Sequence, residues 1–275
     1  MIKKTLFLFC AFPLTFWAQE FPNKEDLIPV DDMQVKVQYD VKFRYAHEKD
    51  NQVKHDKMYT EIGKTVCHSY IEREWNNEIS LNKSFIERGK RNTNAFASLY
   101  SNIGEVFMGY PKGKNTVIYS LDVLGTYKYE EPIKELKWTI RNETLDTLGY
   151  HCTMATCTYA GREYKAWFTE EIPLSYGPWK LGGLPGLIIK AETIDGDYRF
   201  VLCGIENIKG AENIYLWKRD FVNSTRKKTR KQEVLLLSRP DAILDQMGIN
   251  YTVKTFSGTP VKLKFFCYDN PLEKE

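Results

Sequence analysis

The chain has 275 residues, and its 39 Lys and Arg against 36 Asp and Glu give a formal net charge of +3. This composition excludes collagen, coiled coil and low-complexity disorder, and the charge excess is too small for a nucleic-acid-binding surface. Aromatic residues make up 14% of the chain, with 17 Tyr, 15 Phe and 6 Trp. Because these residue types favour strands, we predict a β-rich protein that is long enough to bury a core.

The first eighteen residues have the three parts of a secretory signal peptide. Residues 1–4 are cationic, residues 5–17 are apolar, and Ala18 is a small residue at a cleavage position. The apolar run is shorter than the roughly 20 residues that cross a bilayer, and we expect no transmembrane span after signal removal. The sequence therefore predicts export to the periplasm, the outer-membrane surface or the medium, with residues 19–275 as a single β-rich domain.

Strand patterns begin directly after the predicted leader. Residues 35–45 alternate between apolar and polar, which predicts a strand with one wet face, and residues 47–57 predict a polar turn. Residues 58–71 predict a strand or hairpin, with Gly63 as a bulge or turn. Further strands are predicted over residues 106–120 (a hairpin), 136–142, 150–159 and 164–169.

The clearest hairpin joins residues 187–194 to residues 198–205. Asp195-Gly196 lies between them and predicts a type I′ turn. Helices are predicted in residues 81–102 and, as two short helices, in residues 221–247, before a return to strand in residues 251–268. Many short strands at close spacing indicate an antiparallel meander that forms an open barrel or a sandwich-like sheet, with a few short helices.

A Gly- and Pro-rich segment precedes this hairpin. Pro185 fixes φ near −65° and Gly186 can take a positive φ, as the centre of a type II turn requires. We interpret the segment as a structural turn; an alternative is a binding rim, because aromatic side chains in such a loop are less often core. The turn residues are Gly177, Pro178, Gly183, Leu184, Pro185, Gly186, Leu187 and Ile188. The candidate binding residues are Trp167, Tyr176 and Trp179.

The hexapeptide of residues 183–188 reads GLPGLI, and the chain resembles the GLPGLI family of exported Bacteroidota proteins. The resemblance implies a signal peptide, a β-rich fold and an outer-envelope location. It implies no reaction, so it supplies no catalytic residues. Further matching positions are Ile62-Gly63-Lys64, Gly149-Tyr150, Cys152, Gly161-Arg162, Trp167, Ile172-Pro173, Gly177-Pro178 and Asn270-Pro271-Leu272-Glu273.

The cysteines are candidates for disulfides, since an exported chain reaches an oxidising compartment. The mature chain has an odd number of them, so at least one stays free or pairs outside the chain. Cys67-His68 and His151-Cys152 are neighbours whose side chains would point to opposite faces of a strand, so neither pair binds one ion unless its strand bulges. A site of two Cys, or of one Cys and one His, assembled across strands stays open as an alternative, but the histidines have none of the spacings of zinc sites, and we predict no metal site and no cofactor. The candidates are Cys67, Cys152, Cys157, Cys203 and Cys267.

No sequence signature for nucleophilic catalysis or nucleotide binding occurs in the chain. We therefore expect a non-catalytic binding or accessory protein of the cell envelope, whose concave β-face takes an envelope protein or an apolar or glycan ligand. The alternative is an extracellular or periplasmic hydrolase acting on glycans or peptides, with Glu170 and a distant acid as its carboxylates. A purely structural component would have the same sequence features.

Overall fold

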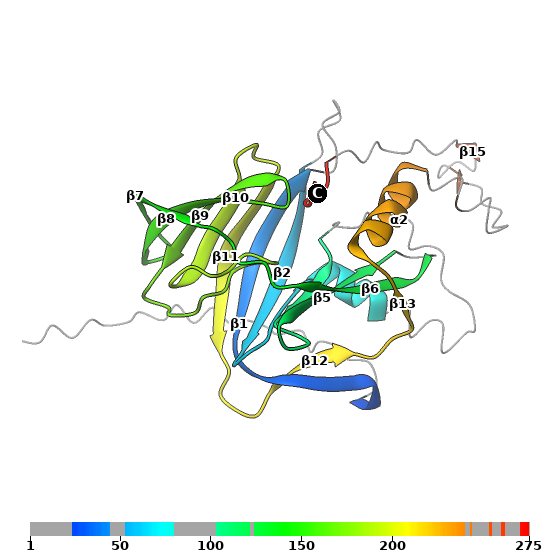
Figure 1. Ribbon diagram of the computed structural model, residues 1–275, viewed down its shortest axis with the longest axis horizontal. Coiled ribbons are helices and arrows are strands. Elements are labelled where there is room, and N and C mark those ends of the chain that lie inside the picture. The colour runs from blue at the N-terminus through cyan, green and yellow to red at the C-terminus, as the bar shows by residue number, and fades with distance from the viewer. Residues whose placement is uncertain are drawn as a thin grey trace, which may run out of the picture.

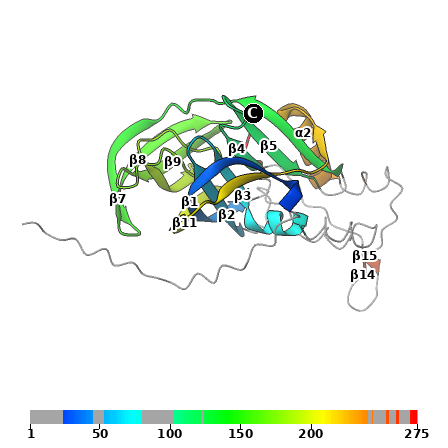
Figure 2. The ribbon, with the colours of Figure 1, turned by 90° about the horizontal axis from the view of Figure 1, so that it is seen from below.

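Thirteen strands form one large sheet that bends into an arch (Figures 1 and 2). The computed structural model describes residues 24–44, 53–79, 103–121, 124–239, 243, 253–254, 260–261 and 270–274. Among these residues, neighbouring strands are antiparallel except β13 and β6. The predicted fold class, mainly β with an antiparallel sheet that does not close and a few short helices, is confirmed.

The order across the sheet is β13-β6-β5-β4-β3-β2-β1-β11-β10-β9-β8-β7, and β12 pairs with the first part of β1. Two further strands, β14 and β15, form a separate pair. The strands are β1 (Leu27–Arg44), β2 (Val53–Gly63), β3 (Cys67–Ile71), β4 (Glu105–Met108), β5 (Lys114–Ser120), β6 (Thr126–Pro132), β7 (Thr139–Thr147), β8 (Tyr150–Tyr159), β9 (Arg162–Thr169), β10 (Leu187–Thr193), β11 (Tyr198–Asn207), β12 (Asn213–Trp217), β13 (Phe221–Asn223), β14 (Val253–Lys254) and β15 (Pro260–Val261).

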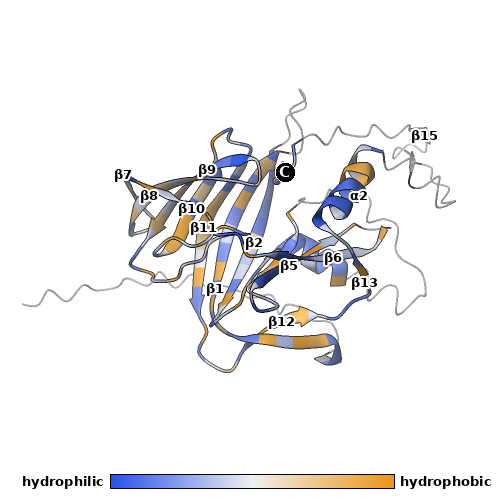
Figure 3. Ribbon diagram, in the orientation of Figure 1, coloured by the Kyte–Doolittle hydropathy of each residue, from blue (hydrophilic) through white to orange (hydrophobic). Residues whose placement is uncertain are grey.

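Strand β1 lies at the centre of the sheet. Its second half has the predicted alternation, visible in Figure 3, and pairs with β2 on one side and β11 on the other. The strand also extends back to Leu27, where it pairs with β12. This first part was not predicted, because its side chains are partly exposed on both faces and leave no alternating pattern.

The predicted hairpin of residues 187–205 forms as β10 and β11, but its turn is not type I′. That turn type needs positive φ at both central residues, and here Gly196 has a φ of 74° while Asp195 does not lie in the left-handed region. The Asp195 carboxylate instead accepts hydrogen bonds from Thr193 Oγ1 at 2.6 Å and the Asp197 N–H at 3.2 Å. These local hydrogen bonds hold the turn in a conformation in which Asp195 does not need a positive φ.

One helix and several strands differ from the sequence prediction. A helix forms at residues 72–79, because Trp75 and Ile79 lie one turn apart and pack against Trp217. Strands β6 and β12 were not predicted, and β2 begins inside the predicted turn of residues 47–57. The predicted helix of residues 81–102 lies outside the described residues, as does most of the strand region 251–268.

The helix α2 (Arg226–Ser238) forms within the region predicted to be helical, after strand β13. Its N-cap is Thr225, whose side chain accepts a hydrogen bond from the Lys228 N–H at 3.3 Å. The first turns are hydrophilic and the end is hydrophobic, as Figure 3 shows. Leu236, at the hydrophobic end, is buried in the main core.

The concave side of the arch is filled by the chain itself. Trp179, Leu181 and Leu184 come from the loop after β9, and they join the same core as the inward side chains of β1, β10 and β11. Leu272, near the other end of the chain, completes this core with 1% exposure. The expected open concave face is therefore occupied by these two segments, and the candidate site lies elsewhere.

Candidate functional site

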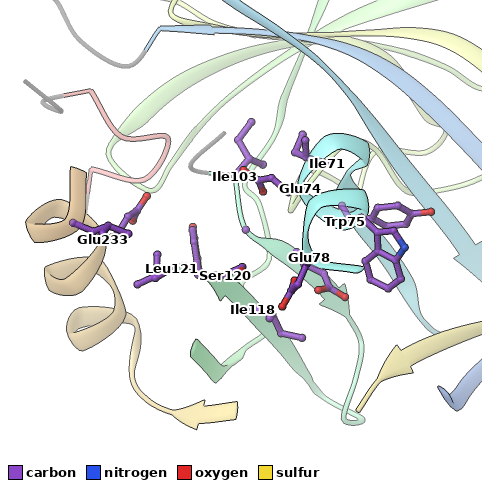
Figure 4. A pocket seen from close by; sticks show the side chains of 14 residues that line it. Ile71, Glu74, Trp75, Glu78, Ile103, Ile118, Ser120, Leu121 and Glu233 are labelled. Atoms are coloured by element: carbon purple, nitrogen blue, oxygen red, sulfur yellow. The ribbon is translucent and has the colours of Figure 1, made fainter. Parts of the chain in front are cut away.

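A pocket lies between the helix of residues 72–79, the β4–β5 hairpin and α2 (Figure 4). Its cavity volume is about 30 Å³, which is room for a group the size of a water molecule or an ammonium, and the pocket opens to solvent beyond it. Its walls combine carboxylates with aromatic and aliphatic side chains, and none of the described residues that line it is cationic. The carboxylates are Glu74, Glu78, Glu105 and Glu233; the aromatic residues are Tyr70, Trp75 and Tyr119.

The spacing of residues along the helix at 72–79 places two carboxylates at the pocket. Glu74 and Glu78 are four residues apart, so they lie on one helix face. Figure 4 shows both side chains reaching into the pocket, with Glu233 facing them from α2. Trp75 packs against Tyr70 and Trp217 and so fixes the helix on the sheet.

Arg219 connects two of these carboxylates from behind the pocket wall. Its Nη1 lies 2.5 Å from Glu78 Oε2, and its Nη2 lies 2.6 Å from Glu105 Oε2. The guanidinium stacks over the Trp217 ring at 4.6 Å. Arg219 follows β12, far from the pocket residues in the sequence, so only the sheet topology brings the three groups together.

Behind Glu105 lies a buried imidazole with a carboxylate on each side. His68 Nε2 lies 3.0 Å from Glu105 Oε1, and Nδ1 lies 3.1 Å from Glu61 Oε2. The ring stacks on Phe107 with 4.0 Å between centroids. Glu61 also binds Lys36 of strand β1 at 3.2 Å, and the series ends there.

These six groups alternate in sign. With His68 protonated, the order is Lys36, Glu61, His68, Glu105, Arg219 and Glu78, with three cations and three anions. We call this series the ion chain. All six are largely buried, so each charge depends on its neighbours to offset desolvation.

The pKa values of the ion chain follow from burial and from these partners. Burial lowers the pKa of His68, but the hydrogen bonds that its ring donates to Glu105 and Glu61 raise it by more, so the net shift is upward. Burial raises the pKa of Glu61, yet His68 and Lys36 bring it to about 2. The Glu78 pKa is raised, because burial there exceeds the opposing effect of Arg219.

The three predicted binding residues lie outside the pocket lining. Trp179 is fully buried at 0% exposure, so its place in a Gly- and Pro-rich loop does not make it part of an exposed rim. Trp167 is 9% exposed and is covered by Lys190, whose Nζ lies 4.1 Å from the ring centroid. Tyr176 is half-buried.

The GLPGLI segment has its expected position at the start of a strand, since Leu187 and Ile188 begin β10 and are fully buried. The prediction that Gly186 takes a positive φ at the centre of a type II turn is wrong, because its φ does not lie in the left-handed region. A Cβ at Gly186 would lie 2.0 Å from the Thr169 carbonyl oxygen, so close backbone approach requires the glycine. Gly183, with a φ of 86°, is the left-handed residue of the hexapeptide.

No disulfide forms among the described cysteines. Cys67, Cys152, Cys157 and Cys203 carry free thiols, and Cys267 lies outside the described residues. Burial raises the pKa of Cys157 to about 12 and that of Cys203 to about 11, so these thiols stay protonated at neutral pH. Within the described ranges, no group of three His, Cys, Asp or Glu side chains is placed to hold a metal ion.

The carboxylates named for the hydrolase alternative lie in a turn after β9. Glu170 and Glu171 are both exposed, and Glu171 accepts a hydrogen bond from the His151 N–H at 2.9 Å. Neither lines the pocket. Over the described residues, no helix is long and apolar enough to cross a membrane.

The pocket residues were missed by the sequence analysis. The one local signal was the spacing of Glu74 and Glu78, which is too short a pattern to stand out from a solvated helix face. The other members of the site lie between positions 36 and 236 of the chain. Their association depends on strand order, which residue patterns along the chain do not encode.

Comparison with known proteins gives a short family match and distant structural similarity. The model of a family described as a protein of unknown function, Porph_ging, matches residues 160–190, which include the hexapeptide. No curated protein matches the chain. Membership of the GLPGLI family stays a prediction.

Three solved structures are similar to parts of the chain. A structure of PNGF-II in space group C2 has a TM-score of 0.49 and 12% identity, and the match covers 73% of this chain and 32% of that one. PNGF-II in space group P21 gives a TM-score of 0.48, 13% identity and coverage of 73% and 33%. The chain thus spans about a third of the length of these PNGF-II structures. A putative outer membrane lipoprotein-sorting protein domain from Vibrio parahaemolyticus has a TM-score of 0.23 and 5% identity, and the match covers 66% of this chain and 87% of that one.

Proposed function

We propose that this protein is an exported, non-catalytic binding protein of the cell envelope, and that its ligand site is the pocket between the helix of residues 72–79 and α2. The ligand is a small organic cation, such as an alkylammonium, whose charged group enters the pocket and whose apolar body lies toward the open side. The observation that carries the proposal is the pocket lining, which holds four carboxylates and three aromatic rings and no cationic side chain among the described residues.

The charge balance at the pocket favours a cation. Glu78 and Glu105 both bind Arg219, and Glu105 also binds His68, but these cationic partners lie in the wall and neither of them lines the pocket. Glu74 and Glu78 reach into the same space from one helix face. A ligand cation would add attraction from the open side of this partly desolvated site, where electrostatic attraction is stronger than in water.

The aromatic side chains suit the same ligand. Trp75, Tyr70 and Tyr119 line the pocket, and aromatic faces attract ammonium and guanidinium groups through their quadrupole. Ile103, Ile118 and Leu121 supply apolar surface for the body of the ligand. An anionic ligand or a neutral glycan would not match the negative charge of this lining.

The test compares benzylammonium with benzyl alcohol, which has the same shape and no charge, by titration calorimetry on the full chain. We expect benzylammonium to bind at least about tenfold more tightly, and Glu74→Gln to weaken it by about tenfold. The matched control is Glu170→Gln, which removes an exposed carboxylate away from the pocket. Equal affinity for the two probes, or an equal effect of the two variants, would refute recognition of the charge.

A second measurement follows from the raised pKa of Glu78. Its charged form binds the cation, so affinity should increase as the pH rises through this pKa. In Glu78→Gln this increase should disappear. An unchanged pH dependence in the variant would remove Glu78 from the proposed site.

A further inference from the structure

Residues 270–274, called the 270–274 segment below, lie against the ends of strands that are remote from one another in the sequence. Asn270 Nδ2 donates to the Arg44 carbonyl at the end of β1 at 2.9 Å. The Lys274 N–H donates to the Ala160 carbonyl in the β8–β9 turn at 2.8 Å. Figure 1 shows this end of the chain beside the end of β1.

Arg162 contacts the backbone of this segment from a fully buried position. Its Nε donates to the Pro271 carbonyl at 3.0 Å and the Leu272 carbonyl at 3.1 Å, and its Nη2 donates to Pro271 O and Asn270 Oδ1. The guanidinium is itself oriented by Asp195 at 2.7 Å. Such a fork of donors fixes both the position and the direction of an extended peptide.

Tyr198 adds to this backbone recognition. Its hydroxyl donates to the Asn270 carbonyl at 2.7 Å, while its ring stacks under the Arg162 guanidinium at 4.7 Å. The side chain therefore orients Arg162 and binds the segment at the same time.

The segment is also recognised through its side chains. Glu273 lies 2.5 Å from Lys180 Nζ and 2.7 Å from Arg226 Nε, and Leu272 is buried in the main core. Lys180 has a second carboxylate, Glu131, at 2.7 Å. Among the described residues, Arg226 forms its ion pair with Glu273.

An empty site would leave strong donors without partners. Arg162 is at 0% side-chain exposure, and four of its hydrogen bonds end on the 270–274 segment. Leaving such buried donors unpaired is costly. Every one of these contacts joins the segment to a residue at least 47 positions away in the chain. The contacts therefore do not depend on the segment being covalently joined to the residues that bind it.

We infer that the sheet end carries a recognition site for a short acidic peptide of the form Asn-Pro-Leu-Glu, and that the 270–274 segment is its resident ligand. The site binds the same peptide when a second molecule supplies it. Arg162 and Tyr198 read the backbone, Lys180 and Arg226 read the glutamate, and the core reads the leucine.

The test uses the full chain with Asn270→Ala and Glu273→Ala, which weakens the resident segment, and a fluorescent peptide Asn-Pro-Leu-Glu-Lys. Fluorescence anisotropy should show binding to this variant at least about tenfold tighter than to the wild type, whose site is occupied. A peptide with Lys in place of Glu should bind at least about tenfold more weakly, because it meets Lys180 and Arg226 with like charge.

The charge-reversed peptide is a control that leaves the protein unchanged. Equal binding of the two peptides, or no binding to a variant with a wild-type circular dichroism spectrum, would overturn the inference. If the double variant does not fold, the wild-type chain is used with millimolar spin-labelled peptide. Resonances of Arg44 and Ala160 should then broaden with the acidic peptide and not with the charge-reversed one, and absence of this difference would also overturn the inference.

Discussion

Nε2 of His68 lies 3.0 Å from Oε1 of Glu105, and this buried contact links the pocket wall to the interior of the sheet. The other oxygen of Glu105 binds Arg219, so one carboxylate joins the imidazole to the guanidinium. Loss of the central imidazole would therefore leave each of these buried carboxylates with one cation fewer, Glu61 with Lys36 and Glu105 with Arg219. This relationship makes His68 the position where the ion chain is most sensitive to substitution.

We expect His68→Leu to lower the free energy of unfolding by about 3 kcal/mol or more, because Glu61 and Glu105 remain buried without the cation between them. Chemical denaturation measures the effect. The control is His55→Gln, at an exposed position of β2, where we expect a change within about 0.5 kcal/mol. Equal effects of the two substitutions would contradict the role of the ion chain.

The same histidine predicts a loss of stability at alkaline pH. Its pKa is raised in the folded state, so the stabilisation is complete below the unfolded pKa of about 6.5 and is lost as the pH rises through the folded pKa. Urea midpoints between pH 5 and pH 9 should decline over this window in the wild type and less in His68→Gln. A wild-type profile in the variant would show that another group titrates.

Glu61 gives the opposite dependence at acid pH. Its folded pKa of about 2 lies below its ordinary value of 4.5, so its stabilisation is present above 4.5 and is lost as the pH falls toward 2. Acid denaturation followed by near-UV circular dichroism should therefore shift to higher pH in Glu61→Gln. No shift would mean that Glu61 does not control the acid limit.

Trp179→Ala should destabilise the fold by about 3–5 kcal/mol, because it leaves a large cavity in the main core. Thermal and chemical unfolding measure this loss. Val222→Ala, at an exposed position of β13, is the control and should change stability by less than about 1 kcal/mol. A small effect of Trp179→Ala would show that its side chain is not a core element.

Gly186→Ala should cost about 2 kcal/mol or more, since the added Cβ would lie 2.0 Å from the Thr169 carbonyl oxygen and the backbone must move. Gly204→Ala is the matched control in β11, where a Cβ would lie 3.6 Å from Gln38 in ordinary contact. We expect the control to change the urea midpoint little. Similar midpoints for the two variants would show that the β10 start tolerates a side chain.

The sequence by itself determined the strands whose side chains alternate and the hairpin around Asp195-Gly196. Alternate side chains of β1 face the main core as their spacing predicts, because alternation is a property of neighbours along one strand. These side chains are Val37, Tyr39, Val41 and Phe43. The start of β10 at Leu187 followed from the hexapeptide for the same local reason.

Only the tertiary structure decided the pocket, the ion chain and the place of Trp179. Lys36 and Glu78 stand at opposite ends of a series that crosses strands β1 to β4, and strand order rather than spacing along the chain brings its members together. Trp179 became core because its loop folds back into the concave side of the arch. A buried charge or ring depends on what packs around it, and those neighbours come from distant parts of the chain.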